Sequence, residues 1–164
     1  MPTLHQLLIG RLDTARADLE EVIGRLKDEM LPWAPTEGMR TIKGQLEEIG
    51  ATELQIMVSV REQRALSYKE ASTFAGSAST VEELHRSLDE IRAETLAYLN
   101  SLSVADLEAP TSFPIDWFES LGLPETPLHE AFRSLAQHEW YHTGQLVSYL
   151  WARGDDPYKW GSHG

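Results

Sequence analysis

The sequence contains no cysteine, and this absence excludes several kinds of chemistry. A chain without thiols has no disulfide, no thiolate metal site and no cysteine nucleophile. It also fits a reducing compartment. No apolar run approaches the roughly 20 residues that a membrane helix needs, and residues 1–6 lack the cationic start and apolar core of a signal peptide. We therefore expect a cytoplasmic protein that does not enter a membrane.

Basic residues are scarce as well. The chain has 14 lysine and arginine residues against 26 acidic ones, which gives a formal net charge of -12. A nucleic-acid partner requires a basic face that neutralises phosphates, and an anionic membrane surface requires the same. We expect neither partner, and the acidic surface is most simply explained by solubility. A length of 164 residues fits one core, so we predict a single domain over residues 1–164.

Apolar residues recur every three or four positions in four segments, which is the pattern of amphipathic helices. The predicted helices cover residues 3–30, 41–68, 80–99 and 126–153. Prolines end the first helix, a capping box of Thr80 and Glu83 begins the third, and Gly154 ends the fourth. No segment has a strand pattern. The predicted fold class is therefore all-α, an up-down four-helix bundle without a sheet.

Two connections separate the later helices. Residues 72–79 are small and polar and are expected to form a loop. The connection from Ser101 to Thr126 is long and proline-rich, and it carries the aromatic residues Phe113, Trp117 and Phe118. Connections of this length are uncommon in compact domains and are often functional. We expect this one to lie across one end of the bundle.

The segment His138-Glu139-Trp140-Tyr141-His142 is the strongest chemical signal in the sequence. Residues four apart lie on one side of a helix, so both imidazole rings can bind the same ion. On a helical wheel His142 lies within the apolar stripe, His138 lies at its edge, and Glu139 also faces inward. Such groups are costly to bury unless they are bonded or liganded. The pattern predicts a divalent metal site, and a histidine pair hydrogen-bonded inside the core is the alternative.

The same five residues match the HExxH pattern of zinc proteases, in which Glu139 would be the general base. However, no glutamate follows Glu139 to supply a third ligand, and the extended pattern would need Gly and His where the chain has Gln145 and Ser148. A metalloprotease is therefore a minor alternative. A di-iron carboxylate bundle requires inward-facing Glu-x-x-His on two helices. Glu139 and His142 have that spacing, and so do Glu82 and His85, but His85 is expected to be exposed.

The stretch from His138 to Leu146 resembles the H-x-x-x-H-x-G-Q-L motif of the DinB/YfiT-like superfamily of metal-binding four-helix bundles. The stretch from Thr41 to Glu53 is similar to that family's motif on the second helix, in which a ligand histidine is followed five residues later by Glu. The order of the helices, the Trp33-Ala34-Pro35 turn and the long third connection agree too. The resemblance covers nearly the whole chain and implies a bundle of the DinB/YfiT-like type.

The resemblance also implies a third metal ligand, and this chain has Glu48 where the family usually has histidine. A carboxylate binds the same metals, so the expected ligands are Glu48, His138 and His142, with open positions for water or substrate. Glu53 or Glu139 would orient a ligand or a bound water. On the wheel Glu53 lies more squarely on the buried stripe, so the alternative is a solvated Glu48. The ion would be zinc, nickel, iron or manganese.

Characterised members of the family include thiol S-transferases and a maleylpyruvate isomerase. The resemblance therefore implies a metal-dependent transferase or hydrolase that acts on a small molecule, with a low-molecular-weight thiol as one candidate partner and Glu139 as the candidate catalytic residue. Glu48 adds negative charge and should make the metal a weaker Lewis acid, so a non-enzymatic or inactive metal-binding bundle is the alternative. The second helix has apolar residues outside its main stripe, which predicts a homodimer.

Overall fold

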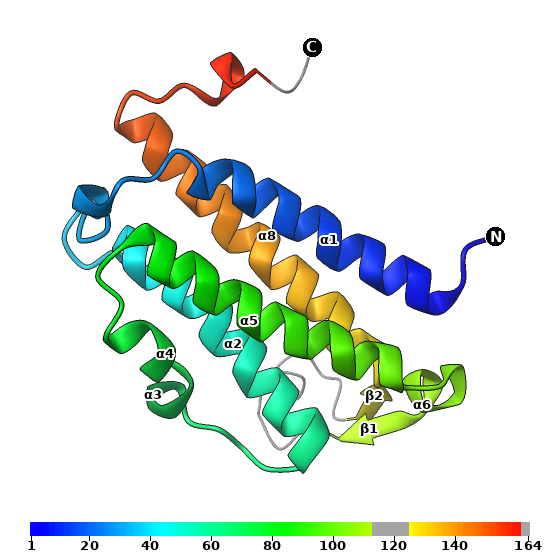
Figure 1. Cartoon of the computed structure of the whole chain (residues 1–164). Helices are drawn as coiled ribbons and strands as arrows, with labels where there is room; N and C mark the ends of the chain where they lie inside the picture. The colour runs from blue at the N-terminus through cyan, green and yellow to red at the C-terminus, as the bar shows by residue number, and fades with distance from the viewer. Residues whose placement is uncertain (113–124, 162–164) are drawn as a thin grey trace.

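The computed structural model describes residues 1–112 and 125–161 of the chain. Four long helices form the body of the molecule (Figure 1): α1 (Leu4–Ile23), α2 (Ile42–Glu62), α5 (Val81–Ser101) and α8 (His129–Ala152). Short helices occupy the connections: η1 (Asp28–Met30), α3 (Tyr68–Ala71), α4 (Thr73–Gly76), α6 (Val104–Glu108) and η2 (Pro157–Lys159). The predicted all-α fold class is confirmed. Within the described residues no helix is both long and apolar enough to cross a membrane.

The directions of the long helices are up, down, down, up, rather than a strict alternation (Figure 1). On α2 and α5, Gly50 lies against Leu88 and Glu53 pairs with Arg92, so residue numbers rise together and these two helices are parallel. The reason is the connection between them. Residues 63–80 contain α3 and also α4, which forms where residues 72–79 were predicted to be a loop. They return along α2 before α5 begins.

Capping residues in the sequence determine where several of the helices begin. The Thr41 hydroxyl accepts a hydrogen bond from the Gly44 amide and begins α2, and the predicted capping box of Thr80 and Glu83 begins α5. The first and second helices are shorter than predicted, since α1 ends at Ile23 and α2 at Glu62. The apolar periodicity continues past both ends, but the chain turns there.

The long connection begins and ends in a small sheet, which corrects the prediction of no sheet. β1 (Pro110–Ser112) pairs antiparallel with β2 (Glu125–Pro127), with Thr111 opposite Thr126. The two ends of the connection lie side by side, and pairing satisfies backbone groups that would otherwise need other partners. Because Thr126 and Pro127 belong to β2, α8 begins at His129 rather than at the predicted cap. Phe113, Trp117 and Phe118 lie outside the described residues.

The apolar core is divided along the length of the bundle. One cluster contains Leu46, Leu84 and Leu146, and a second contains Leu12 and Phe132. Between these clusters the long helices carry buried polar side chains, which are Glu53, Arg92, Thr95, His138, Glu139, His142 and Thr143. The chain therefore places a polar layer across the middle of the bundle.

The parallel packing of α2 on α5 depends on Gly50. A Cβ atom at this position would lie 2.5 Å from Phe74 Cζ and 2.9 Å from Leu88 Cδ2. We predict that Gly50→Ala lowers the free energy of unfolding by about 1–3 kcal/mol, because the added methyl overpacks this contact. At Gly10 on α1, an added Cβ atom would meet nothing within 4 Å. Gly10→Ala should be neutral or stabilising by up to about 1 kcal/mol in the same denaturation experiment. Equal effects of the two substitutions would contradict the packing described.

Candidate metal centre

His138 and His142 lie one turn apart on α8 and point into the polar layer. Their residues are 8% and 3% exposed, and their Nε2 atoms are 3.1 Å apart. Glu48 reaches the same point from α2, so that one potential ligand atom from each of the three side chains lies within 4.8 Å of the other two. The structure thus brings together the three residues that the sequence predicted as ligands.

A chain of hydrogen bonds fixes the ring of His142. The Tyr149 hydroxyl donates to the Arg40 carbonyl oxygen over 3.0 Å and accepts from Gln45 Nε2 over 3.0 Å. Gln45 must then present its oxygen to His142 Nδ1, which lies 2.6 Å away. An amide oxygen can only accept, so the hydrogen of neutral His142 is on Nδ1 and the lone pair on Nε2 faces His138. This is the tautomer that binds a metal through Nε2.

Burial keeps both rings neutral. It is the largest cause that lowers the pKa of His138, to about 3, and the nearby His142 and Arg40 charges act in the same direction. Burial also lowers the pKa of His142, although the charge of Glu48 opposes this effect. A neutral imidazole is the form that binds metal. No proton has to leave an imidazolium before these rings bind.

Two observations show that the residues fit a divalent ion. Glu48 Oε2 is buried, and although Arg40 Nη2 lies 3.0 Å away as an ion-pair partner, no described residue gives this oxygen an aligned hydrogen bond. The 3.1 Å between the Nε2 atoms is close to the roughly 3.3 Å that separates two nitrogens bound tetrahedrally at about 2.0–2.1 Å from zinc. Two imidazoles and one carboxylate are a common ligand set for zinc, iron, nickel and manganese.

The three side chains line a cavity of about 430 Å³. The other residues that line it are Arg40, Ser134, Gln137 and Tyr141. Arg40 Nη2 lies 3.0 Å from Glu48 Oε2, and burial together with Glu48 and Glu47 raises the pKa of the nearby Tyr68 hydroxyl. A molecule in this cavity would meet a cation, hydroxyl and amide groups, and the two imidazoles.

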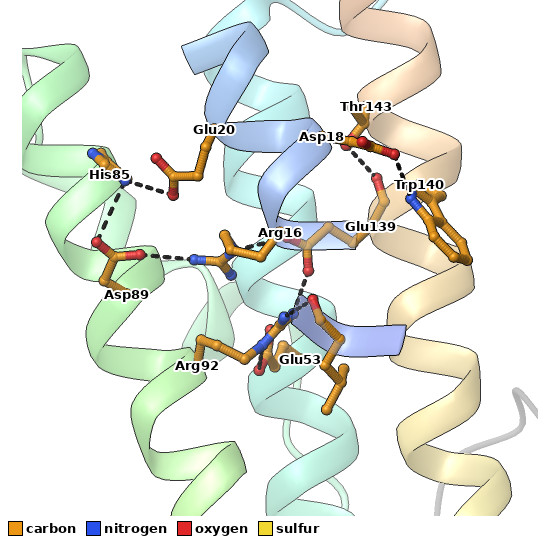
Figure 2. Close-up of polar contacts among 11 residues, drawn as sticks. Arg16, Asp18, Glu20, Glu53, His85, Asp89, Arg92, Glu139, Trp140 and Thr143 are labelled. Carbon is orange, nitrogen blue, oxygen red and sulfur yellow. Dashed lines mark hydrogen bonds and ion pairs between the residues drawn. The ribbon is translucent and has the colours of Figure 1, made fainter. Parts of the chain in front are cut away.

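Glu139 lies next to His138 in the sequence, but its carboxylate is in an ion network (Figure 2). Glu139 Oε1 accepts from Arg16 Nε over 2.8 Å, and Oε2 accepts from Arg92 Nη2. Arg92 also donates to both oxygens of Glu53, over 2.9 Å each. Burial alone would lower the pKa of Arg92, but Glu53 and Glu139 raise it, so the guanidinium stays charged. We call Arg16, Glu53, Arg92 and Glu139 the buried ion network.

The network reaches the surface of the bundle through Asp89, which accepts from Arg16 Nη1 over 3.0 Å (Figure 2). His85 Nε2 lies 2.7 Å from Glu20 Oε1 and 3.4 Å from Asp89 Oδ2. The ligand atoms of Glu20, His85 and Asp89 are also close enough together for a cation. Here, however, each group already has a partner in an ion pair, and Asp89 is well exposed. We therefore interpret this group as surface ion pairs.

Several residues of the site were not predicted from the sequence. Gln45 lies three positions before Glu48, and this spacing on a helix was the available signal for a residue on the same face. Arg92 stands four residues after Leu88, on the apolar stripe of α5, where a buried charge requires partners. Arg40 precedes its helix and gave no periodic signal.

A comparison with known families places these residues in context. A family model described as the DinB superfamily matches residues 11–146, which contain Glu48, His138 and His142. A search of curated proteins found no match.

The buried ion network yields a stability prediction. Arg92→Met would leave the charges of Glu53 and Glu139 without this partner, so the free energy of unfolding should fall by about 3–5 kcal/mol. Arg61 is the matched control, because its guanidinium makes a long, exposed ion pair of 3.8 Å with Glu94. Arg61→Met should cost less than about 1 kcal/mol. Chemical denaturation measures both, and a cost at Arg92 no larger than at Arg61 would contradict the role of the network.

The role of Gln45 is tested separately. Gln45→Leu removes the nearer of the two amide oxygens that face His142 Nδ1, the other being Gln145 Oε1 at 3.1 Å. NMR of the ring nitrogens should therefore show a smaller share of the tautomer with its hydrogen on Nδ1. Metal affinity should fall about 10–100-fold, as is typical when a partner of a ligand histidine is lost. Gln55 is also on α2, and its amide donates to the Leu66 carbonyl oxygen in the connection that follows, so it provides the control. If Gln55→Leu and Gln45→Leu lower the affinity equally, the hydrogen-bond chain does not orient the ligand.

Proposed function

Because the chain belongs to the DinB superfamily, we propose that it is a metal-dependent enzyme, a transferase or hydrolase, that acts on a small molecule. The observation that carries this proposal is the group of Glu48, His138 and His142 in the wall of the cavity. The alternative of a histidine pair hydrogen-bonded inside the core would account for the contacts of His142 with Gln45, Gln145 and His138, but not for the Glu48 carboxylate beside the two rings. The two Nε2 atoms lie 3.1 Å apart beside Glu48 Oε2, which is buried and has no hydrogen bond from the residues that the structure describes.

The protein's own residues have distinct tasks in this proposal. Glu48, His138 and His142 hold the ion, and Gln45 keeps His142 in the binding tautomer. When bound, a divalent ion lowers the pKa of a coordinated water or thiol and supplies a nucleophile near neutral pH. Ser134 and Gln137 offer hydrogen bonds to a substrate in the cavity. A low-molecular-weight thiol is the co-substrate that we propose on the basis of the family resemblance.

Glu139 is better suited to positioning than to catalysis. Its two oxygens accept hydrogen bonds from two arginines, and its residue is only 1% exposed. Both carboxylate oxygens are therefore engaged by guanidinium groups, and Glu139 is not among the residues that line the cavity. We propose that Glu139 holds the turn of α8 that carries His138. For the same reason, we propose that Glu53 serves as the ion-pair partner of Arg92 and does not orient a metal ligand.

A second candidate function is a bundle that does not catalyse a reaction. The observation that favours it is the contact of 3.0 Å between Arg40 and Glu48, which occupies the proposed carboxylate ligand. In an inactive relative, this ion pair would replace the metal. The two functions differ in whether the protein retains a metal ion.

The metal site is tested by the metal content of protein purified without a histidine tag. We predict one equivalent of a divalent metal in the native chain and its loss in His138→Ala and in His142→Ala, while circular dichroism stays helical. Glu48→Gln should weaken retention more than Glu47→Gln, since the adjacent Glu47 is no part of the ligand group.

The opposite results are equally clear. Equal retention of metal by the two glutamate variants would remove Glu48 from the ligand set. A native chain that neither contains nor takes up a metal would favour the inactive bundle.

A further inference from the structure

Arg40 is held at its backbone, while its side chain extends into the cavity. It directly precedes Thr41, the N-cap of α2, and its carbonyl oxygen accepts a hydrogen bond from the Tyr149 hydroxyl over 3.0 Å. Its side chain is 51% exposed and lines the cavity beside His138 and His142. The backbone of the bundle therefore presents an accessible cation to a small-molecule site.

The contact of Arg40 with Glu48 leaves most of the guanidinium unused. Nη2 lies 3.0 Å from Glu48 Oε2, yet the two atoms do not align as a hydrogen bond, and this oxygen has no such bond from the described residues. A guanidinium has five N–H donors in a planar fork. Over residues 1–112 and 125–161, Glu48 is the one ion-pair partner of Arg40. The Glu48 carboxylate therefore does not accept the two parallel hydrogen bonds that this guanidinium can donate.

The charges of the site change when Glu48 holds a metal. In the structure, the positive charge of Arg40 and the negative charge of Glu48 offset each other over 3.0 Å. A divalent ion would add two positive charges within a few ångströms of the guanidinium. The ion would then offset the negative charge of Glu48, so the Arg40 guanidinium would no longer have this carboxylate as its ion-pair partner. Because the cavity would then carry an excess of positive charge, it would favour an anionic ligand.

We propose that Arg40 binds the carboxylate of a small organic acid that enters this cavity. This inference rests on the proposed function and adds the substrate class to it. A carboxylate matches the guanidinium fork through two parallel hydrogen bonds, which one misaligned contact to Glu48 does not provide. Because the chain as a whole carries a net charge of -12, a local cation is needed to hold an anionic substrate. The exposed ring of Tyr141 gives the apolar part of such an acid a surface to contact.

The first experiment needs no metal, so its outcome is independent of the proposed function. Glu48→Gln releases Arg40 in metal-free protein, and calorimetry should show that benzoate binds about tenfold more tightly than to the native chain. The double variant Glu48→Gln with Arg40→Gln should lose this gain. Glu48→Gln with Arg61→Gln should keep it, because Arg61 is similarly exposed at 44% but lies in another pocket. Benzamide, which has the same shape without the charge, should show no gain.

The second experiment uses zinc-loaded protein. Arg40→Gln should bind zinc with unchanged stoichiometry and bind benzoate about tenfold more weakly, while Arg61→Gln matches the native chain. If the two arginine variants bind benzoate equally in both experiments, the proposal is overturned. If the native chain takes up no zinc but the metal-free gain depends on Arg40, the metal hypothesis fails and the anion site stands.

Discussion

The buried ion network joins the whole bundle, because each of the four long helices contributes one of its residues. Arg16 comes from α1, Glu53 from α2, Arg92 from α5 and Glu139 from α8. Two positive and two negative charges offset one another in a layer where an unpaired charge would be costly. An ion network has a preferred geometry, unlike the apolar contacts above and below it. It therefore fixes how far each helix is shifted along its neighbours.

The candidate metal centre depends on this geometry. Arg16 and Arg92 bind Glu139 on one side of α8, and the same turn of the helix presents His138 and His142 to residues of α2. Gln45 and Tyr149 hold the opposite side through hydrogen bonds between α2 and α8. A shift of α8 by a fraction of a turn would break both sets of contacts. The polar layer thus combines a structural half, in which both carboxylates are paired with arginines, and a functional half, which lines the cavity.

The sequence predicted the features that are written in local patterns. The spacing of His138 and His142 shows that they share a face, and the capping box at Thr80 marks the start of α5. Glu48 came from a motif rather than from the helical wheel, which favoured Glu53 as the buried acid. Glu53 is indeed the more buried, with a side chain 2% exposed against 15% for Glu48, but it pairs with Arg92, whereas Glu48 faces the histidines.

The features that the sequence did not predict depend on contacts between distant segments. Periodicity shows which face of a helix is buried but not the direction of its neighbour, so the parallel packing at Gly50 could not be foreseen. The pairing of β1 with β2 joins segments whose short length gives no alternation to detect. Arg40 lies just before α2 and outside any helical pattern, so only the packing of α2 on α8 shows that it lines the cavity.

The most direct test of the account is a crystal of tag-free protein grown with zinc and measured at the zinc absorption edge. The account predicts its strongest anomalous peak in contact with His138 Nε2, His142 Nε2 and the Glu48 carboxylate. A peak only at Glu20, His85 and Asp89, or no peak on the chain at all, would contradict it.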